Sequence, residues 1–298
     1  MYHKPVLLQE SVDGLNITHS GVYVDATFGG GGHSAEILKR LSKKGLLIGF
    51  DQDTDAHKNL ISDQRLILIH GNFRYIKNYL DYYQINKVDG ILADFGVSSH
   101  QFDTLDRGFS FRLGGKLDMR MNTAKKITAA DILNSYEQES LYYIFKNYCD
   151  INNPGKLVSL IQKHREFRKF DDIESFVELI KPIAPKQKEI KYFAQIFQAL
   201  RIEVNDEINS LLDFLNSIPE ILKSGGRLSI ISYHSLEDKP VKNLIKFGKT
   251  TPTEEINLFG NTKSVFKPIN RQVVTPTEDE ILENTRAKSA KLRIAERI

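Results

Sequence analysis

The sequence contains no tryptophan and a single cysteine, Cys149. One cysteine cannot form an internal disulfide, and this is typical of proteins in a reducing compartment, so we expect a cytoplasmic location. We expect Cys149 to be a small buried side chain rather than a nucleophile. No apolar run approaches the roughly 18 residues that a membrane-spanning helix needs. We also expect no signal peptide, because no apolar stretch follows the first charged residues.

Neither sign of charge is in large excess, since 41 Lys and Arg face 38 Asp and Glu, for a net charge of +3. This balance permits a polyanionic partner without requiring one. The histidines are scattered and no cysteine partners them, so we predict no metal site. Gly114-Gly115-Lys116 is followed by Leu117 rather than by Ser or Thr, which excludes a Walker A phosphate loop.

The most informative stretch of the sequence is 22–53. Two apolar strands are expected at 22–25 and 46–51, with a glycine-rich turn at 29–32 and a helix at 33–41 between them. Glycine lacks a Cβ, so it can take a positive φ and lets a ligand approach the backbone closely. Each strand ends on an aspartate. We therefore predict a βαβ unit with carboxylates at the edge where parallel sheets bind ligands.

Two ligand classes fit this unit. Gly30, Gly32 and Ala35 satisfy G-x-G-x-x-G/A, and Asp51 follows Gly32 by 19 residues, as in a site for a nicotinamide dinucleotide. S-adenosylmethionine presents the same ribose diol for Asp51 but has no pyrophosphate. Asp25 favours S-adenosylmethionine, because a carboxylate beside the turn suits the ammonium group of that ligand better than a phosphate.

Further strands and helices follow along the chain. Strands are expected at 65–70, 88–93, 227–232, 267–274 and 290–295, and the last pattern also allows a helix. Helical spacing predicts helices at 77–84 and 208–222. After the third strand, Asn72 and Phe73 either lie near an adenine or serve as a loop amide and a core aromatic. The fourth strand runs into Asp94.

A long region without strand-like alternation separates the fourth strand from the fifth. Residues 95–120 are rich in Gly, Ser, aromatics and Arg, and we predict a long functional loop there. Residues 129–200 contain several helical segments. The sequence thus predicts a sheet built from both ends of the chain, at 1–106 and 206–298, interrupted by a helical domain at 107–205.

The tetrapeptide Asp94-Phe95-Gly96-Val97 suits one particular chemistry. The exocyclic amine of cytosine or adenine is a poor nucleophile, because its lone pair is delocalised into the ring. A carboxylate and a backbone carbonyl that accept its N–H groups would draw the nitrogen toward tetrahedral geometry and align it with a methyl donor. Proton loss after transfer needs only a modest base. We therefore predict that Asp94 is the catalytic residue.

Motifs along nearly the whole chain resemble those of the bacterial small-subunit ribosomal RNA methyltransferase H family. They are His3–Leu8, Asp25–Gly29, Gly31–Ser34, Asp94 with Gly96–Ser99, Arg107–Phe111, Leu117–Met121, Phe197–Ile202, Val204-Asn205, Ser232–Asp238 and Leu292–Arg297. The resemblance implies a class I, Rossmann-like methyltransferase fold with an inserted all-helical domain for substrate recognition. It also implies S-adenosylmethionine-dependent N4-methylation of a cytidine in the decoding region of small-subunit rRNA.

Carried over by position, the cofactor contacts of the family fall on seven residues. They are Gly31, Gly32, His33, Asp51, Phe73, Asp94 and Gln101. Two positions depart from the pattern, since Phe95 stands where Leu is expected and His100 where Pro is expected. His100 would loosen the turn that positions Gln101. The stretch 152–170 also matches the family poorly.

Contacts with the substrate are expected from three sources. Other amine methyltransferases place an aromatic three residues after the acid, where this chain has Val97, so the base would stack on Phe109, Phe111 or Tyr233 instead. A loop carrying Tyr233 and His234 would close over the base, and no nucleophile elbow supports a Ser-His-acid reading of it. Basic residues form a loop cluster, Arg107, Arg112, Lys116 and Arg120, and a cluster in the insertion, Lys163, Arg165, Arg168, Lys169, Lys186, Lys188 and Lys191.

These observations predict an S-adenosylmethionine-dependent rRNA cytosine-N4 methyltransferase that acts on small-subunit rRNA or on the assembled small subunit, without a membrane partner. Two alternatives remain at this point. One is a nicotinamide-dependent oxidoreductase on the same βαβ unit, because a fold does not fix its chemistry. The other is a non-catalytic RNA-binding factor in ribosome assembly. The sequence does not specify an oligomeric state.

Overall fold

The computed structural model describes residues 5–251, 264–270 and 272–298. His3 of the family resemblance therefore lies outside the described residues, as does most of 247–261, where Thr, Gly and Pro in the sequence predict a surface loop. Among the described residues, we find no helix with the length and apolar character of a membrane-spanning segment.

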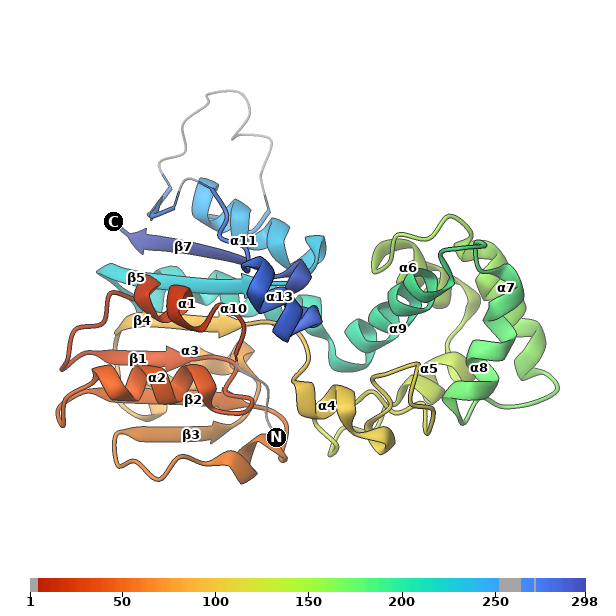
Figure 1. Ribbon diagram of the computed structural model, residues 1–298, viewed down its shortest axis with the longest axis horizontal. Coiled ribbons are helices and arrows are strands. Elements are labelled where there is room, and N and C mark those ends of the chain that lie inside the picture. Colours follow the sequence, from red (N-terminus) through yellow and green to blue (C-terminus); the bar gives the residue numbers. More distant parts are fainter. Residues whose placement is uncertain (1–4, 252–263, 271) are drawn as a thin grey trace. The chain divides into compact units, whose positions relative to one another are not determined.

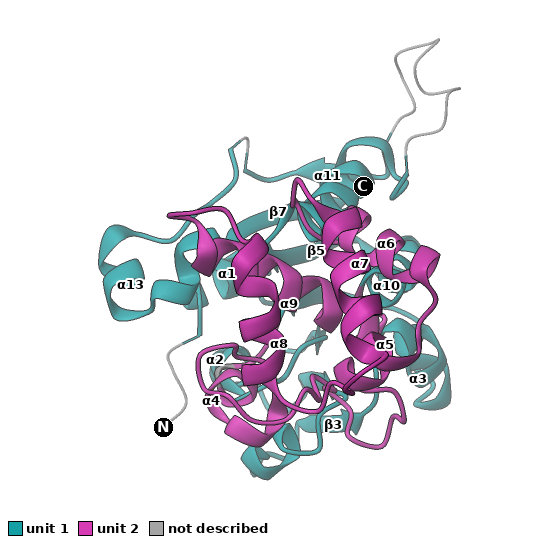
Figure 2. Ribbon diagram, turned by 90° about the vertical axis from the view of Figure 1, so that its right-hand side faces the viewer, with its two compact units in different colours: residues 1–96, 208–298 teal, residues 97–207 magenta. Residues whose placement is uncertain are grey.

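The chain divides into two units, drawn in different colours in Figure 2. Unit 1 comprises Met1–Gly96 and Ile208–Ile298, and unit 2 comprises Val97–Glu207. The first boundary follows Gly96, so the chain from Val97 to Glu207 groups with the helices and not with the sheet.

Unit 1 contains a seven-stranded sheet with the order β3-β2-β1-β4-β5-β7-β6 (Figure 1). The strands are β1 (Val22–Asp25), β2 (Leu46–Asp51), β3 (Leu66–His70), β4 (Val88–Asp94), β5 (Leu222–Ser232), β6 (Phe266–Pro268) and β7 (Lys291–Arg297). Strands β1 to β5 pair parallel with one another, and β7 pairs antiparallel with both β5 and β6. The α/β fold class expected from the sequence is confirmed.

The last two strands resolve points that the sequence left open. The pattern at 290–295 is a strand, β7, and not a helix. The strand expected at 267–274 is shorter than predicted, because β6 covers only Phe266–Pro268. Pro268 has no N–H with which to extend the ladder. Val274 forms an isolated bridge with Leu292.

Helices cover both faces of the sheet in unit 1 (Figure 1). Alternate side chains of a strand point to opposite faces. Tyr23 and Leu47 accordingly pack in a cluster with α1 (Leu8–Gly14) and α2 (Gly32–Arg40). Their neighbours, among them Val24, Ile48 and Ile91, pack in a separate cluster with three other helices, namely α3 (Ile76–Tyr82), α10 (Glu207–Ile221) and α11 (Ser235–Phe247). The strands are therefore buried on both sides, as their nearly continuous apolar runs require.

Short helical elements complete unit 1. They are η1 (Ala56–Asn59), η2 (Phe73–Tyr75), α13 (Glu278–Glu283) and η5 (Thr285–Ser289).

Unit 2 is helical and has an apolar core of its own. Its elements are α4 (Ser99–Asp103), η3 (Leu105–Arg107), α5 (Ala129–Ser135), α6 (Gln138–Asn147), α7 (Pro154–Arg165), α8 (Ile173–Ile180), η4 (Lys181–Ile183) and α9 (Glu189–Asn205). Phe176 lies in the core beside Phe170 and Phe197, with ring centroids 5.5 and 6.1 Å away.

The segment expected as a long loop at 95–120 is a built structure. It contains α4 and η3, and its later part is held by Arg107 and Asn205. The Arg107 guanidinium donates hydrogen bonds to the backbone carbonyls of Arg120 and Met121, both at 3.0 Å. The Asn205 side chain accepts the Met121 N–H (2.7 Å) and donates to the Met119 carbonyl (2.8 Å). One buried amide thus makes hydrogen bonds with two backbone groups of this segment.

We expect Asn205→Ala to destabilise the protein by about 2 kcal/mol, because it removes the buried hydrogen bonds that Asn205 makes with the Met121 N–H and the Met119 carbonyl. The free energy of unfolding of the wild type and the variant, measured in urea, checks this value. Asn147→Ala is the matched control, since Asn147 is exposed and bonds only within its own helix. An equal decrease in the free energy of unfolding of the two variants would contradict the role assigned to Asn205.

Candidate active site

Three carboxylates lie at one edge of the sheet in unit 1. Asp25, Asp51 and Asp94 end β1, β2 and β4. In the register, Asp25 is level with Gly49 of β2 and Leu92 of β4. The chain passes from β1 to β2 on one side and later adds β4 on the other, so this edge is the topological switch point of the sheet. Ligands of open parallel sheets bind at such a point.

The glycine turn between β1 and α2 forms a cradle at this edge. Gly29 has φ +53° and Gly31 has φ +77°, which side chains with a Cβ rarely adopt. A Cβ on Gly29 would meet only the Thr27 carbonyl, at 3.9 Å, so the space beside this backbone is open. A Cβ on Gly32, by contrast, would collide with Pro5 at 2.1 Å. The turn therefore offers backbone to a ligand on one side and packs tightly on the other.

The Asp51 carboxylate accepts hydrogen bonds from the backbone around this turn and can still accept hydrogen bonds from a ligand. Its Oδ2 accepts the Gly29 N–H and its Oδ1 accepts the Asp53 N–H, both at 2.8 Å. Each carboxylate oxygen has a second lone pair, so the pair can still accept two ribose hydroxyls. Burial raises the pKa of Asp51 to about 6, and the two backbone hydrogen bonds oppose that shift. The glycine cradle and this acceptor pair fit the methionine and ribose parts of S-adenosylmethionine.

Asp25 is fully buried, with 0% of its surface exposed. Its carboxylate accepts the Ser34 hydroxyl at 2.6 Å and the Thr27 N–H at 3.1 Å. Burial raises its pKa to about 6. Asp25 thus fastens the turn to the first residues of α2, a role that the sequence analysis missed. Its contact with the ammonium group of the cofactor stays a prediction.

Asp94 is joined to the glycine turn and to the loop after β5. Its N–H donates to the Thr27 hydroxyl at 2.7 Å, and its Oδ1 accepts the Tyr233 hydroxyl at 2.9 Å. Burial raises the pKa of Asp94 to about 6, against the lowering effects of His33 and Tyr233, while Asp25 and Glu237 raise it further.

His33 lies in the first turn of α2, where it is buried. Burial lowers its pKa, and the nearby charge of Asp94 opposes this effect. The ring lies 3.2 Å from the Val6 carbonyl through Nε2, so that nitrogen carries the proton and donates it. His33 therefore shapes the wall beside Asp94, and its contact with the cofactor stays a prediction.

An aromatic trio borders the end of β3. Phe73 packs against Phe95 and Phe214, with ring centroids 5.7 and 5.2 Å away. Asn72 donates to the side chains of Gln52 and Ser210, so it fixes the turn that carries Phe73. Phe95, which stands where the family resemblance leads us to expect Leu, has aromatic partners that explain it. Adenine contact by Phe73 stays a prediction.

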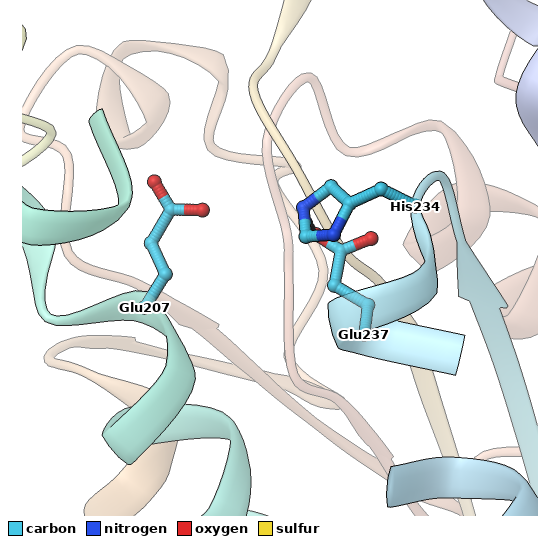
Figure 3. Close-up of side chains that lie close together, drawn as sticks. All are labelled: Glu207, His234 and Glu237. Atoms are coloured by element: carbon cyan, nitrogen blue, oxygen red, sulfur yellow. Dashed lines mark ion pairs between the residues drawn. The ribbon is translucent and has the colours of Figure 1, made fainter. Parts of the chain in front are cut away.

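Tyr233 and His234 lie in the loop between β5 and α11, and Figure 3 shows His234 at the start of α11 beside Glu237 of that helix. Glu237 accepts the Tyr233 N–H through Oε2 at 2.8 Å, and its Oε1 is 3.0 Å from Nε2 of His234. Of the three aromatics expected to stack on the base, Tyr233 is the one that bonds to Asp94. Its contact with the base itself stays a prediction, as does that of His234.

The expected sites in unit 2 have partners within that unit. Ser98 and Gln101 form a reciprocal capping box at the start of α4, with distances of 3.1 and 3.2 Å. This box fixes Gln101 although His100 replaces the expected Pro, so the loosening predicted from His100 does not occur. The cofactor contact of Gln101 stays a prediction.

The basic residues of the loop cluster differ in their exposure, and their contact with the substrate stays a prediction. Arg107 is only 8% exposed and Phe109 is buried. Arg120 is paired with Asp118 and also donates to two backbone carbonyls. Phe111 packs against Phe193 and Phe197. Arg112, whose guanidinium lies 5.7 Å from the Phe111 ring, is exposed. Motif membership could not distinguish residues that build a loop from residues that face a substrate.

A sheet of this strand order, with an antiparallel seventh strand, a glycine turn after β1 and acids ending β2 and β4, defines a class I methyltransferase. The cofactor of this class is S-adenosylmethionine. The model of the MraW methylase family matches residues 1–298, and the chain belongs to this family. The resemblance read from the sequence motifs is thereby confirmed, and the nicotinamide alternative is wrong.

Relatives with high identity span the whole chain. The ribosomal RNA small subunit methyltransferase H of Bacteroides fragilis is 53% identical over 296 residues, 99% of this chain and 97% of that protein. The protein of the same name from Parabacteroides distasonis is 53% identical over 100% of this chain and 98% of its own. The crystal structure of an rRNA methylase from Streptococcus thermophilus matches 98% of this chain and 96% of its own at 14% identity, with a TM-score of 0.45. A TM-score of 0.45 is too low to support an argument, so the fold assignment is based on the strand order.

We expect Asp51→Asn to weaken the binding of S-adenosylmethionine roughly 10- to 100-fold, because an ionised acceptor for the ribose diol is lost. Isothermal titration calorimetry measures this change directly. Asp13→Asn, at an exposed surface ion pair, is the control and should bind as the wild type does. If Asp51→Asn binds S-adenosylmethionine as tightly as the wild type, Asp51 does not contact the cofactor.

Proposed function

We propose that this protein transfers the methyl group of S-adenosylmethionine to the exocyclic N4 of a cytidine in small-subunit ribosomal RNA. The main support is the state of Asp94. It ends β4 beside the glycine turn, and one of its carboxylate oxygens is already occupied by Tyr233. The other oxygen, Oδ2, accepts no hydrogen bond from any residue in the described ranges. The names of the relatives support rRNA as the substrate.

Asp94 would act on the attacking amine. Oδ2 accepts one N4–H, which draws the lone pair of the nitrogen out of conjugation and aims it at the methyl carbon. Bound S-adenosylmethionine supplies a methyl group activated by its sulfonium centre. As the N–C bond forms, the S–C bond breaks and its electrons stay on sulfur. The proton then leaves N4, and Asp94 is the nearest base to receive it.

The charge of Asp94 would also select the substrate. An ionised carboxylate only accepts hydrogen bonds. Cytosine presents an amine at position 4, which donates, whereas uracil presents a carbonyl there, which would repel the carboxylate. Because the pKa of Asp94 is about 6, the ionised form predominates at neutral pH. The target cytidine must be unpaired or flipped out to reach this edge.

We expect Asp94→Asn and Asp94→Ala to lower kcat for methyl transfer at least about 100-fold, because positioning of N4 and the base are lost together. Rates are measured with tritiated cofactor on protein-free small-subunit rRNA and on assembled subunits. Calorimetry should give a cofactor Kd within about tenfold of wild type.

Wild-type turnover in Asp94→Ala would show that this role is wrong. A non-catalytic assembly factor instead predicts RNA affinity without turnover in the wild type itself, and mass mapping of the methylated nucleosides tests that alternative.

The end of α7 in unit 2 is the best candidate for an RNA contact. Phe167 is 82% exposed, and Lys163, Arg168 and Lys169 around it are exposed as well. Arg165 of the same cluster instead donates to the backbone carbonyls of Leu133 and Tyr136, so it is structural. An exposed aromatic ring flanked by cations suits an unstacked base and its phosphates. We place the RNA grip of the insertion here.

Replacing Lys163, Arg168 and Lys169 together by Ser should reduce the salt dependence of RNA binding, with the log–log slope falling by about 2. Phe167→Ala should cost about 1–3 kcal/mol of binding, from lost stacking. Fluorescence anisotropy with an rRNA fragment, read at several salt concentrations, measures both. The matched control replaces the exposed Lys39, Lys43 and Lys44 by Ser. An equal loss of slope in the control would mean that the contact is not local to α7.

A further inference from the structure

Asp94 has two carboxylate oxygens in different situations. Oδ1 accepts the Tyr233 hydroxyl at 2.9 Å, whereas Oδ2 has no donor among the described residues. The Tyr233 ring also lies against the turn after Asp94, since a Cβ built on Gly96 would meet it at 3.5 Å. Gly96 has φ +109°, so the backbone bends at this contact. Tyr233 therefore restrains both the carboxylate and the chain that carries it.

Tyr233 is itself held from two directions. Its N–H donates to Glu237 at 2.8 Å, in the first turn of α11. The next residue, Asp238, pairs with Arg293 of β7 through two hydrogen bonds of 2.7 and 2.9 Å. Asp238 also accepts the hydroxyl of Ser232 at the end of β5, at 3.4 Å. Asp238 thus ties the start of α11 to both β5 and β7, on either side of the loop that carries Tyr233.

We infer that Tyr233 is a positioning residue for Asp94. Its hydroxyl occupies Oδ1, so Oδ2 is the oxygen that receives the substrate amine, and the Asp238–Arg293 pair keeps Tyr233 in place. This assignment rests on the proposed function of Asp94. It also separates two roles of the tyrosine, because the hydroxyl acts on Asp94 whereas stacking on a base would involve only the ring.

The hydroxyl has a second effect, on the charge of Asp94. The groups that face this carboxylate are His33 from α2, Asp25 from β1, Glu237 from α11 and Tyr233. Burial, Asp25 and Glu237 raise the pKa of Asp94, while His33 and Tyr233 lower it. Loss of the hydroxyl removes one lowering effect, so the pKa rises further. Because the ionised form is the active one, activity should then be lost at a higher pH as the solution is acidified.

Tyr233→Phe tests the inference, since it removes the hydroxyl and keeps the ring. We expect the acidic midpoint of kcat to move up by roughly one pH unit or more. For a shift of one unit, the rate at pH 6.5 should fall about threefold and return close to the wild-type rate at pH 9. Carboxyl ¹³C NMR, with the Asp94 signal assigned from Asp94→Asn, should show the same shift of the pKa in the absence of substrate.

Two controls separate positioning from general damage. Tyr23→Phe removes a hydroxyl that is bonded to Thr18 and has no bond to Asp94, so its acidic midpoint should stay at the wild-type value. Arg293→Gln should move the midpoint in the same direction as Tyr233→Phe, and Arg293→Lys should restore it in part.

An unmoved midpoint in Tyr233→Phe, by kinetics and by NMR, would overturn the inference, as would an equal shift in Tyr23→Phe. If the wild type fails to methylate cytidine, the proposed function fails, yet the NMR titration still decides whether Tyr233 controls Asp94.

Discussion

One hydrogen bond joins the two halves of the site. The N–H of Asp94, at the end of β4, donates to the hydroxyl of Thr27 in the turn after β1. These positions are 67 residues apart in sequence, and the bond fixes Asp94, the proposed catalytic acid, to the turn of the proposed cofactor site. Since methyl transfer needs the acceptor nitrogen and the methyl carbon in line, the geometry of the reaction depends on how rigid this connection is. The parallel register of β1 and β4 makes the bond available.

Burial is the second constraint on the site. Asp25, Asp51 and Asp94 share one edge, and burial raises the pKa of each to about 6. Backbone or hydroxyl donors oppose the shift at every one of them, so all three can be ionised at neutral pH. Each carboxylate also organises backbone: Asp51 holds Gly29, and Asp25 holds Thr27. The acids of this site are therefore structural elements of the cradle as well as chemical groups.

Much of this architecture could be predicted from the sequence, for physical reasons. Alternating and continuous apolar runs gave the strands, and aspartates placed at their ends identified the ligand-binding edge. What sequence reasoning missed are contacts between distant segments. The hydrogen bond from Tyr233 to Asp94 joins residues that are 139 positions apart, and neither local sequence motif predicts it. Arg107 is predicted from the sequence to contact the substrate, but it is buried, and the carbonyls of Arg120 and Met121 accept hydrogen bonds from its guanidinium.

The position of β7 has a consequence for how the chain reaches its native state. β7 is the last of the seven strands in chain order, but it lies inside the sheet, between β5 and β6. Until β7 has been synthesised, β5 is an edge strand, and its unpaired N–H and C=O groups can pair with strands of other chains. The nascent protein thus passes through an interval of vulnerability to aggregation, which ends only when the strand carrying Arg293 closes the gap.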